Sequence, residues 1–422
     1  MPSSLQQKYD DLQFAHGQRG AVATGDALTI QLGELLLSHG VEIRASDIHI
    51  EPTASGARIR YRIDGLLYEL LTLSAEVRDP LTRSIKLKAN MAIEAVGRSK
   101  PQDGRIDYLA SGRPLDLRLS SFPTIFGDVL AIRILDRSTP LLPLEGLGFP
   151  DSTFKPFWQI IQRPSGLFLV TGPANSGKTT TLYGVLGKLH SPRIKIVTLE
   201  DPVEYQLEGI DQAQINSAVG VTFASGLRAI LRQDANVILV GEIRDAETAE
   251  IAIRASLTGH RVFSTLHTRH ACGAVVRLMD MGIEPHLIVA SASGVLAQRL
   301  IRTLCPSCKS VEPAVVGTVS RLWAQENSVI QPPEPSTIQG YRSVGCAACS
   351  GTGYRGRTGI FELLILHDEL KRLIIERDPA QLYKTALTAG MRTMLLDGLD
   401  KVARGVTTVE EVLRVTGETG NV

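Results

Sequence analysis

A short glycine-rich stretch after residue 170 limits most strongly what this chain can fold into. Gly172-x4-Gly177-Lys178-Thr179 has the spacing of a P-loop. The apolar run at residues 167–170 precedes it and a helical pattern follows it, so the sequence predicts a strand, a loop and a helix in succession. A glycine-rich turn before a surface helix is the alternative, but it would not require Gly-Lys-Thr in this context. We therefore predict a phosphate-binding loop.

The chemistry of such a loop follows from its backbone. Its N–H groups and the helix N-terminus form a positive concavity that holds phosphates. Lys178 would reach the β- and γ-phosphates, and the hydroxyl of Thr179 would help to hold Mg²⁺. The predicted nucleotide-binding residues are Gly172, Pro173, Ala174, Asn175, Ser176, Gly177, Lys178, Thr179 and Thr180.

Composition narrows the class of protein further. A length of 422 residues suggests two or three domains. With 45 lysines and arginines against 44 acidic residues, the charge does not favour a nucleic-acid partner. The N-terminus lacks the pattern of a signal peptide, and no apolar stretch approaches the roughly 18–20 residues that span a bilayer. We therefore expect a cytoplasmic protein without a transmembrane segment.

Hydropathy patterns divide the chain into successive parts. Residues 1–24 are polar, and we expect them to be poorly ordered or helical only in the context of the fold. Residues 25–137 combine helical stripes with period-2 strands, which predicts a small α/β domain. Prolines mark residues 138–150 as a semi-rigid linker. In residues 151–422 strands and helices alternate as in a mostly parallel sheet flanked by helices, with a loop-rich insert at residues 300–358 and helices at the end.

Acidic residues follow predicted strands of the second domain. A strand at residues 237–240 delivers Glu242 to the carboxyl edge of the sheet, where ligands bind. There it could polarise an attacking water or assist Mg²⁺, although it could also cap the next helix. Glu200 and Glu204 end another strand at the same edge, where they would suit Mg²⁺ or a positioned water; a solvated acidic turn explains them equally well. His267 follows a third strand and could bond an acid or sense the γ-phosphate, although lone histidines are more often structural.

Four of the five cysteines form two Cys-x-x-Cys pairs. Cys305 with Cys308, and Cys346 with Cys349, supply four thiolates that satisfy tetrahedral Zn²⁺ without an open position. Such a closed site is structural and would stabilise a loop-rich insert. An iron–sulfur cluster or two redox dithiols are the alternatives. Cys272 is outside both pairs, and we predict a buried small hydrophobe there.

The predicted N-terminal domain is rich in arginine: Arg58, Arg60, Arg62, Arg105, Arg118 and Arg133. Most of these side chains would be solvated. One or two could act as arginine fingers if this domain packs on a nucleotide site, and composition does not choose among them.

These motifs resemble those of the type II secretion ATPases and the type IV pilus assembly ATPases. The resemblance begins near residue 45 and extends to the C-terminus. The segments that carry it are residues 45–52 (ASDIHIEP), 101–105 (PQDGR), 199–205 (LEDPVEY, similar to an aspartate box), 240–245 (VGEIRD, similar to a Walker B motif), 259–268 (similar to a histidine box) and 405–412 (GVTTVEEV).

The resemblance implies a fold, a ligand set and an assembly. The fold would be a PAS-like N2 α/β domain joined by a linker to a RecA-like P-loop ATPase core, with the zinc insert of the export and assembly branch. Six subunits would form a ring that binds ATP between each N2 domain and its own core. By the same resemblance Glu242 is the catalytic acid, while Glu200, Glu204 and His267 line the site. Arg118 and Arg133 would reach the phosphates, and the four paired cysteines would hold Zn²⁺.

Three departures from the family pattern stand out. Asn175 replaces a loop glycine, and we expect it to fit because asparagine tolerates positive φ better than most residues. Arg269 and His270 stand where the family commonly has Asn-Asp, which changes that surface. Because only about 25 residues precede the N2 pattern, we expect a short form lacking the additional N-terminal domain with which many relatives bind the inner-membrane platform.

The predicted function is that of a cytoplasmic hexameric ATPase that powers pseudopilus assembly and protein export in type II secretion. It would dock on the inner membrane through a platform protein. A motor for type IV pilus assembly, conjugation or DNA uptake is the alternative within the class. A nucleic-acid-binding zinc-ribbon NTPase is the alternative from another class, and the near-neutral charge counts against it.

Overall fold

The computed structural model describes residues 2–17, 25–93, 100–110, 112–136, 142–326 and 329–417. The chain divides into two compact units. The first contains Met1–Pro140 and Gly345–Thr352, and the second contains Leu141–Val344 and Gly353–Val422. The first residues of the predicted linker, up to 141, and residues 18–24 of the predicted polar segment lie outside the described residues. The division after Pro140 falls within the range predicted as the linker.

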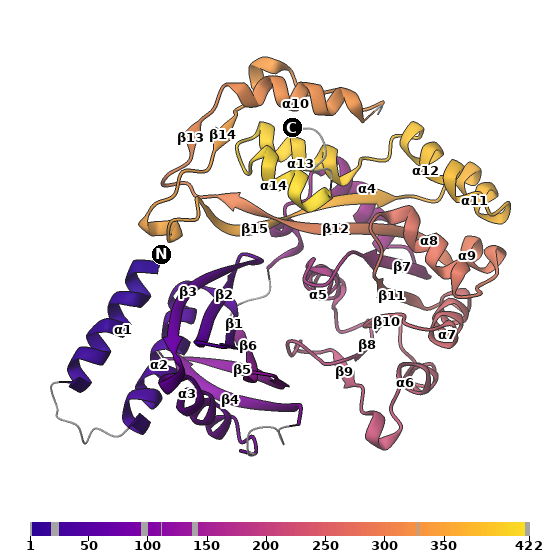
Figure 1. Cartoon of the computed structure of the whole chain (residues 1–422). Helices are drawn as coiled ribbons and strands as arrows, with labels where there is room; N and C mark the ends of the chain where they lie inside the picture. Colours follow the sequence, from indigo (N-terminus) through magenta and orange to yellow (C-terminus); the bar gives the residue numbers. More distant parts are fainter. Residues whose placement is uncertain are drawn as a thin grey trace. The chain divides into compact units, whose positions relative to one another are not determined.

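The first unit is built on a six-stranded antiparallel sheet with the order β3-β2-β1-β6-β5-β4 (Figure 1). Its strands are β1 (Ala45–Thr53), β2 (Gly56–Ile63), β3 (Leu66–Ser74), β4 (Gln102–Ala110), β5 (Arg113–Thr124) and β6 (Gly127–Asp136), and its helices are α1 (Pro2–Gly17), α2 (Gly25–Glu42) and α3 (Ala75–Lys88). Period-2 alternation produces these strands. In β2, Ile59, Tyr61 and Ile63 are buried while the intervening arginines are partly exposed.

Helix α1 decides between the two expectations for the N-terminal segment. It buries Leu5 and Tyr9 in the core of the first unit, where it contacts α2 and β3. Its polar sequence carries little amphipathic periodicity, so packing of these two side chains stabilises the helix more than local propensity does. Residues 2–17 are therefore helical in context and not poorly ordered.

Charged side chains form a row across the sheet of the first unit. The register places Arg62, Asp47, Arg133, Arg118 and Arg105 side by side from β2 to β4. Arg133 Nε lies 3.2 Å from Asp47 Oδ1, and Arg62 Nε lies 3.5 Å from Asp47 Oδ2. Directly opposite residues of an antiparallel pair share one face of the sheet. Arg118 and Arg133, the two arginines singled out by resemblance, therefore lie on the same face.

The second unit contains a seven-stranded sheet with the order β15-β12-β7-β11-β10-β8-β9 (Figure 1). Its strands are β7 (Gly166–Thr171), β8 (Ile196–Glu200), β9 (Asp211–Gln214), β10 (Val237–Val240), β11 (Arg261–Leu266), β12 (Ala292–Leu304) and β15 (Tyr354–Leu364). Neighbouring strands are parallel except that β15 runs antiparallel to β12. The predicted mostly parallel sheet is thus confirmed.

Helices cover both faces of this sheet. The helices of the second unit are α4 (Asp151–Ile161), α5 (Lys178–Leu189), α6 (Phe223–Ile230), α7 (Ala246–Leu257), α8 (Ala271–Asp280), α9 (Pro285–Ser291), α10 (Ala314–Gln325), α11 (Asp368–Ile375), α12 (Pro379–Thr388), α13 (Met394–Ala403) and α14 (Val409–Thr416). Alternate residues of β7 point to opposite faces. Leu167 and Leu169 join the core that contains α7 and α8, whereas Phe168 and Val170 join the core that contains α4 and α5.

The range 300–358 has more regular structure than the predicted loop-rich insert. Strand β12 extends into it, β15 begins within it, and the short strands β13 (Ser310–Val311) and β14 (Tyr341–Arg342) pair with each other. Between them lies α10 (Ala314–Gln325), which buries Val319, Leu322 and Trp323. This spacing is helical, so the signal was present in the sequence beside the more conspicuous cysteines.

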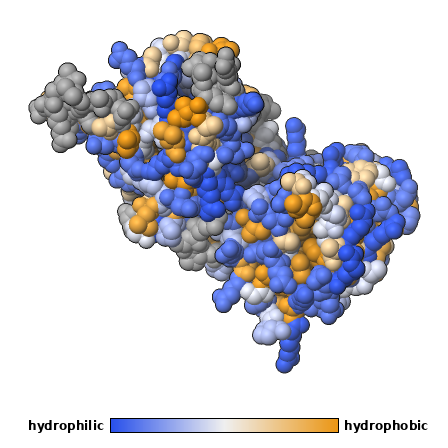
Figure 2. Space-filling view, turned by 90° about the horizontal axis from the view of Figure 1, so that it is seen from below, coloured by the Kyte–Doolittle hydropathy of each residue, from blue (hydrophilic) through white to orange (hydrophobic). Residues whose placement is uncertain are grey.

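Among the described residues, no helix is long and apolar enough to cross a membrane. On the face shown in Figure 2, hydrophobic residues form small patches between hydrophilic ones. Individual apolar side chains are well exposed where β5 leads into β6: Phe122, near the end of β5, is 60% exposed and Ile125, in the turn, is 91% exposed.

A buried carboxyl group ties the edge strand β15 to two helices of the second unit. Glu362 accepts a hydrogen bond from the backbone N–H of Ala271 at the start of α8, at 2.7 Å, and another from the backbone of Met394 at the start of α13. Burial raises the pKa of Glu362 to about 7, although these backbone donors oppose the shift. The folded protein therefore holds this proton to a higher pH than the unfolded chain does.

Stability should consequently fall as pH rises from the usual glutamate pKa of 4.5 to the folded value near 7, because the folded state binds the proton more tightly there. The expected loss from this group is up to about 3 kcal/mol. Glu362→Gln retains an acceptor oxygen but does not titrate. Thermal unfolding of both proteins from pH 5 to pH 8 should show wild type losing stability relative to the variant. A difference in melting temperature that does not change with pH would contradict this.

Candidate nucleotide-binding site

The P-loop connects β7 to α5 at the carboxyl edge of the parallel strands. Three of its residues have φ in the left-handed region: Gly172 (153°), Asn175 (61°) and Gly177 (86°). Such values cost little for glycine, and asparagine tolerates them better than most residues do. Asn175 thus adopts the conformation that the sequence suggested for it.

Lys178 begins α5 and is folded back onto the loop. Its Nζ donates to the carbonyl oxygen of Gly172 at 2.9 Å and to that of Pro173 at 3.0 Å. Burial lowers its pKa to about 8, and the nearby Glu242 carboxylate opposes that shift. An anion would stabilise a buried ammonium whose pKa is lowered in this way, since an opposite charge favours the protonated form.

A cavity of about 210 Å³ lies beside the loop. It is lined by eight of the predicted site residues: Ala174, Asn175, Lys178, Thr179, Glu200, Glu204, Glu242 and His267. The other predicted loop residues, Gly172, Pro173, Ser176, Gly177 and Thr180, belong to the loop or the first turn of α5 and do not line this cavity. The structure therefore gathers residues from four separate stretches of sequence around one space.

Glu242 and His267 meet in this cavity. Glu242 follows β10 and His267 follows β11, the neighbouring parallel strand, and His267 Nε2 lies 3.4 Å from Glu242 Oε2. Arg244 Nη2 donates to Glu242 Oε1 at 2.5 Å. Burial acts to raise the pKa of Glu242, but the hydrogen bond and charge of Arg244, together with His267, lower it below its usual value. The carboxylate is therefore ionised at neutral pH.

Glu200 is fixed more firmly than Glu242. It ends β8, is 4% exposed, and accepts hydrogen bonds from Thr198 Oγ1 at 2.6 Å, from Gln212 Nε2 at 3.2 Å and from the Tyr183 hydroxyl. Donors from β8, β9 and α5 thus share one carboxylate. This arrangement fits an acid that orders the wall of the cavity, and it leaves Glu242 as the more accessible carboxylate.

The two arginines singled out by resemblance belong to the first unit. Arg118 lies 3.8 Å from Asp116 Oδ2, and Arg133 is paired with Asp47 as described above. Their contact with phosphates stays a prediction.

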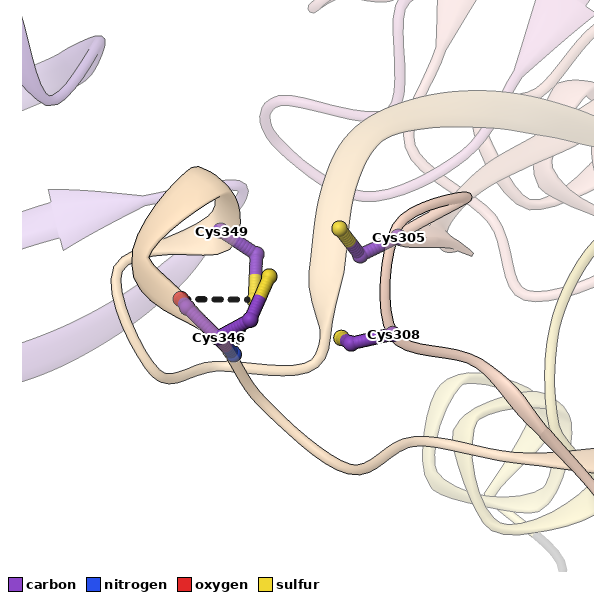
Figure 3. Close-up of side chains that lie close together, drawn as sticks. All are labelled: Cys305, Cys308, Cys346 and Cys349. Carbon is purple, nitrogen blue, oxygen red and sulfur yellow. Dashed lines mark hydrogen bonds between the residues drawn. The ribbon is translucent and has the colours of Figure 1, made fainter.

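The four paired cysteines form a cluster (Figure 3). The Sγ atoms of Cys305, Cys308, Cys346 and Cys349 all lie within 4.8 Å of one another, and in Figure 3 the two pairs face a common centre. Cys346 Sγ and Cys349 Sγ are 3.8 Å apart. A tetrahedral site with Zn–S bonds of about 2.3 Å requires about 3.8 Å between sulfurs, whereas a disulfide requires about 2.05 Å. The donor set fits a four-thiolate zinc site.

Comparison with known proteins decides the family. Residues 22–414 match the model of the family described as type II/IV secretion system protein. The chain belongs to this family. It is 47% identical to the type II secretion system ATPase E of Vibrio cholerae, covering 93% of this chain and 76% of the relative. It is 48% identical to the type II secretion system protein E of Dickeya dadantii, covering 93% and 76%. It is 44% identical to the type IV pilus assembly ATPase PilB of Myxococcus xanthus, covering 93% and 69%.

Solved structures of related ATPases share the fold of this chain. The crystal structure of the pilus retraction motor PilT with bound ADP matches with a TM-score of 0.57 and 26% identity over 90% of this chain and 95% of that one. The ATPase DotB of Legionella pneumophila matches in fold with a TM-score of 0.65 at 20% identity, over 90% and 93% of the two chains. The RecA-like fold predicted for the core is thereby confirmed.

Several contacts around the P-loop cavity were not predicted from the sequence. Tyr183 and Gln212 bond Glu200, and Arg244 bonds Glu242. Gln298 contacts the P-loop itself. For Gln298 a signal existed, because it is a polar residue within the apolar run of β12, and a buried amide must find hydrogen-bond partners.

Proposed function

We propose that this chain is the ATPase of a type II secretion system, which hydrolyses ATP to ADP and phosphate and uses the energy for protein export. The observation that carries this proposal is the meeting of Lys178 of the P-loop with Glu242 and His267 in one cavity, in a chain of the type II/IV secretion family. The identities to type II secretion ATPases over most of the chain support it.

The geometry of the cavity supports the roles proposed for residues of the second unit, and the family resemblance supports those of Arg118 and Arg133. Backbone N–H groups of residues 172–180 cradle the phosphates, Lys178 leaves its carbonyl contacts to pair with them, and the Thr179 hydroxyl helps to hold Mg²⁺. Glu242 orients the attacking water and takes up its proton as the bond to the ADP oxygen breaks. Glu200, Glu204 and His267 line the site and keep its carboxylates in place. Arg118 and Arg133 supply positive charge from the first unit.

The proposal extends to the assembly. As the family resemblance implies, six copies form a ring that is cytoplasmic and docks on the inner membrane through a platform protein. The four cysteines would hold Zn²⁺, whose contribution is to stabilise the insert. The near-neutral charge of the chain favours no direct nucleic-acid partner.

A pilus assembly motor is the second candidate, because the Myxococcus xanthus PilB relative is 44% identical. Introducing Glu242→Gln into the chromosomal gene of the host separates the two. Loss of exported enzymes with intact surface pili supports type II secretion. Loss of pili with normal export supports the pilus motor, and unchanged export and pili would contradict both.

A further inference from the structure

Behind the P-loop lies a side chain that belongs to none of the nucleotide-binding motifs. Gln298 is 3% exposed and comes from β12, the strand next to β7. Its Nε2 donates to the carbonyl oxygen of Ser176 at 2.9 Å, and its Oε1 accepts from Thr181 Oγ1 at 2.7 Å. Because a carbonyl oxygen can only accept, the amide group must face Ser176 with its NH₂. One side chain thus bonds the loop and the first turn of α5 together.

Gln298 also lies close to both glycines of the P-loop, Gly172 and Gly177. A Cβ atom at Gly177 would lie 2.8 Å from Gln298 Nε2, and one at Gly172 would lie 2.3 Å from the backbone carbonyl oxygen of Gln298. The two P-loop glycines are therefore required by β12 as well as by their left-handed φ values. Strand β12 forms the support on which the loop rests.

Fixing the Ser176 carbonyl also fixes the neighbouring N–H. The carbonyl of Ser176 and the N–H of Gly177 belong to one planar trans peptide, so they point in opposite directions. Since the carbonyl is held toward β12, the Gly177 N–H is turned away from that strand. In a P-loop this is an N–H group that cradles phosphate.

We propose that Gln298 is a positioning residue for phosphate binding, which holds the Ser176–Gly177 peptide so that its N–H faces the phosphates. The inference rests on the proposed function of the loop as the nucleotide site. Gln298 does not touch the nucleotide in this scheme; it acts through the orientation of a backbone group. A preorganised donor costs no reorientation when the ligand arrives.

The test separates positioning from simple packing. Gln298→Met removes both hydrogen bonds with little change in volume and charge. Gln298→Glu keeps the acceptor for Thr181 and loses the donor to Ser176. Thr181→Val is the matched control, because it removes the other bond of the same amide and leaves the bond to Ser176. For each purified protein we would measure the Kd for ADP, the KM and kcat for ATP, and the melting temperature.

Both Gln298 variants should weaken ADP binding and raise the KM about tenfold or more, with a smaller change in kcat. Thr181→Val should lower the melting temperature but change the Kd less than about threefold. An unchanged Kd in a folded Gln298→Met or Gln298→Glu protein would overturn the inference, as would an equal loss of affinity in Thr181→Val. Lys178→Ala tests the proposed function separately: if it binds ADP normally, the loop is not the nucleotide site, whereas if it alone loses binding, only the role of Gln298 fails.

Discussion

Glu242→Gln is expected to lower ATP turnover by about a hundredfold or more while ATP still binds. The carboxylate lines the cavity beside Lys178, and its contacts with Arg244 and His267 keep it ionised, with its pKa below the usual value despite partial burial. An ionised carboxylate can accept the proton of an attacking water. Glutamine still accepts the hydrogen bond from Arg244, but it cannot take up that proton, so the geometry survives and the chemistry does not.

Phosphate release under saturating ATP, together with equilibrium binding of ATP, measures the two effects separately. Glu247→Gln provides a matched control: Glu247 lies on α7, its side chain is 60% exposed, and it pairs with Arg228 outside the cavity. We expect this control to turn over ATP at the wild-type rate. If Glu242→Gln retained more than about a tenth of the wild-type turnover, Glu242 would not be the general base.

Cys305→Ser should abolish the zinc binding that we propose for the four-cysteine cluster and cause a large loss of thermal stability. Cys305 is fully buried, and its N–H donates to the Gly353 carbonyl oxygen at 2.9 Å, so its side chain lies where β12 ends and the chain returns into β15. Structural zinc contributes roughly 10–16 kcal/mol in isolated zinc-finger peptides, and removal of one of four thiolates forfeits much of the site's affinity. The short strands β13 and β14 and helix α10, which lie between the two cysteine pairs, should loosen first.

Metal analysis of the purified protein and its melting temperature are the two readouts. Cys272→Ala is the control, since Cys272 is also buried but lies in the core away from the cluster. It should keep one zinc per chain and lose stability only modestly. One equivalent of zinc in Cys305→Ser, or an unchanged melting temperature after complete zinc removal, would contradict a structural zinc site. Visible absorption typical of an iron–sulfur cluster would identify the other metal alternative.

Much of the fold was predictable because its signals are local. The strand, loop and helix around Lys178 appear at residues 166–189, close to the predicted positions, and strand β10 matches its predicted range. The spacing of the two Cys-x-x-Cys pairs predicted a cluster that the structure contains. The strand, loop and helix, and each Cys-x-x-Cys pair taken singly, depend on residues within a few positions of one another, where periodicity and side-chain chemistry act directly on the backbone. The approach of the two pairs to each other is a tertiary contact.

The contacts that complete the site were not predictable in the same way. Gln298 lies 122 positions from Ser176, and their contact exists because β12 is placed next to β7 in the sheet. Glu242 meets His267 because β10 neighbours β11, and Glu200 is held by Gln212 because β9 neighbours β8. Sheet order depends on long-range packing of buried faces, which no local pattern records.

The sequence by itself therefore determined the presence of a P-loop, a mostly parallel sheet, two Cys-x-x-Cys pairs and the family. Tertiary structure decided which carboxylate is accessible, which is fully bonded and what supports the loop from behind. The physical reason is that an acid or an amide takes its role from its neighbours. Glu200 ends β8 and Glu242 follows β10 at the same sheet edge, but three donors surround Glu200, which is 4% exposed, whereas the side chain of Glu242 is 20% exposed at the cavity.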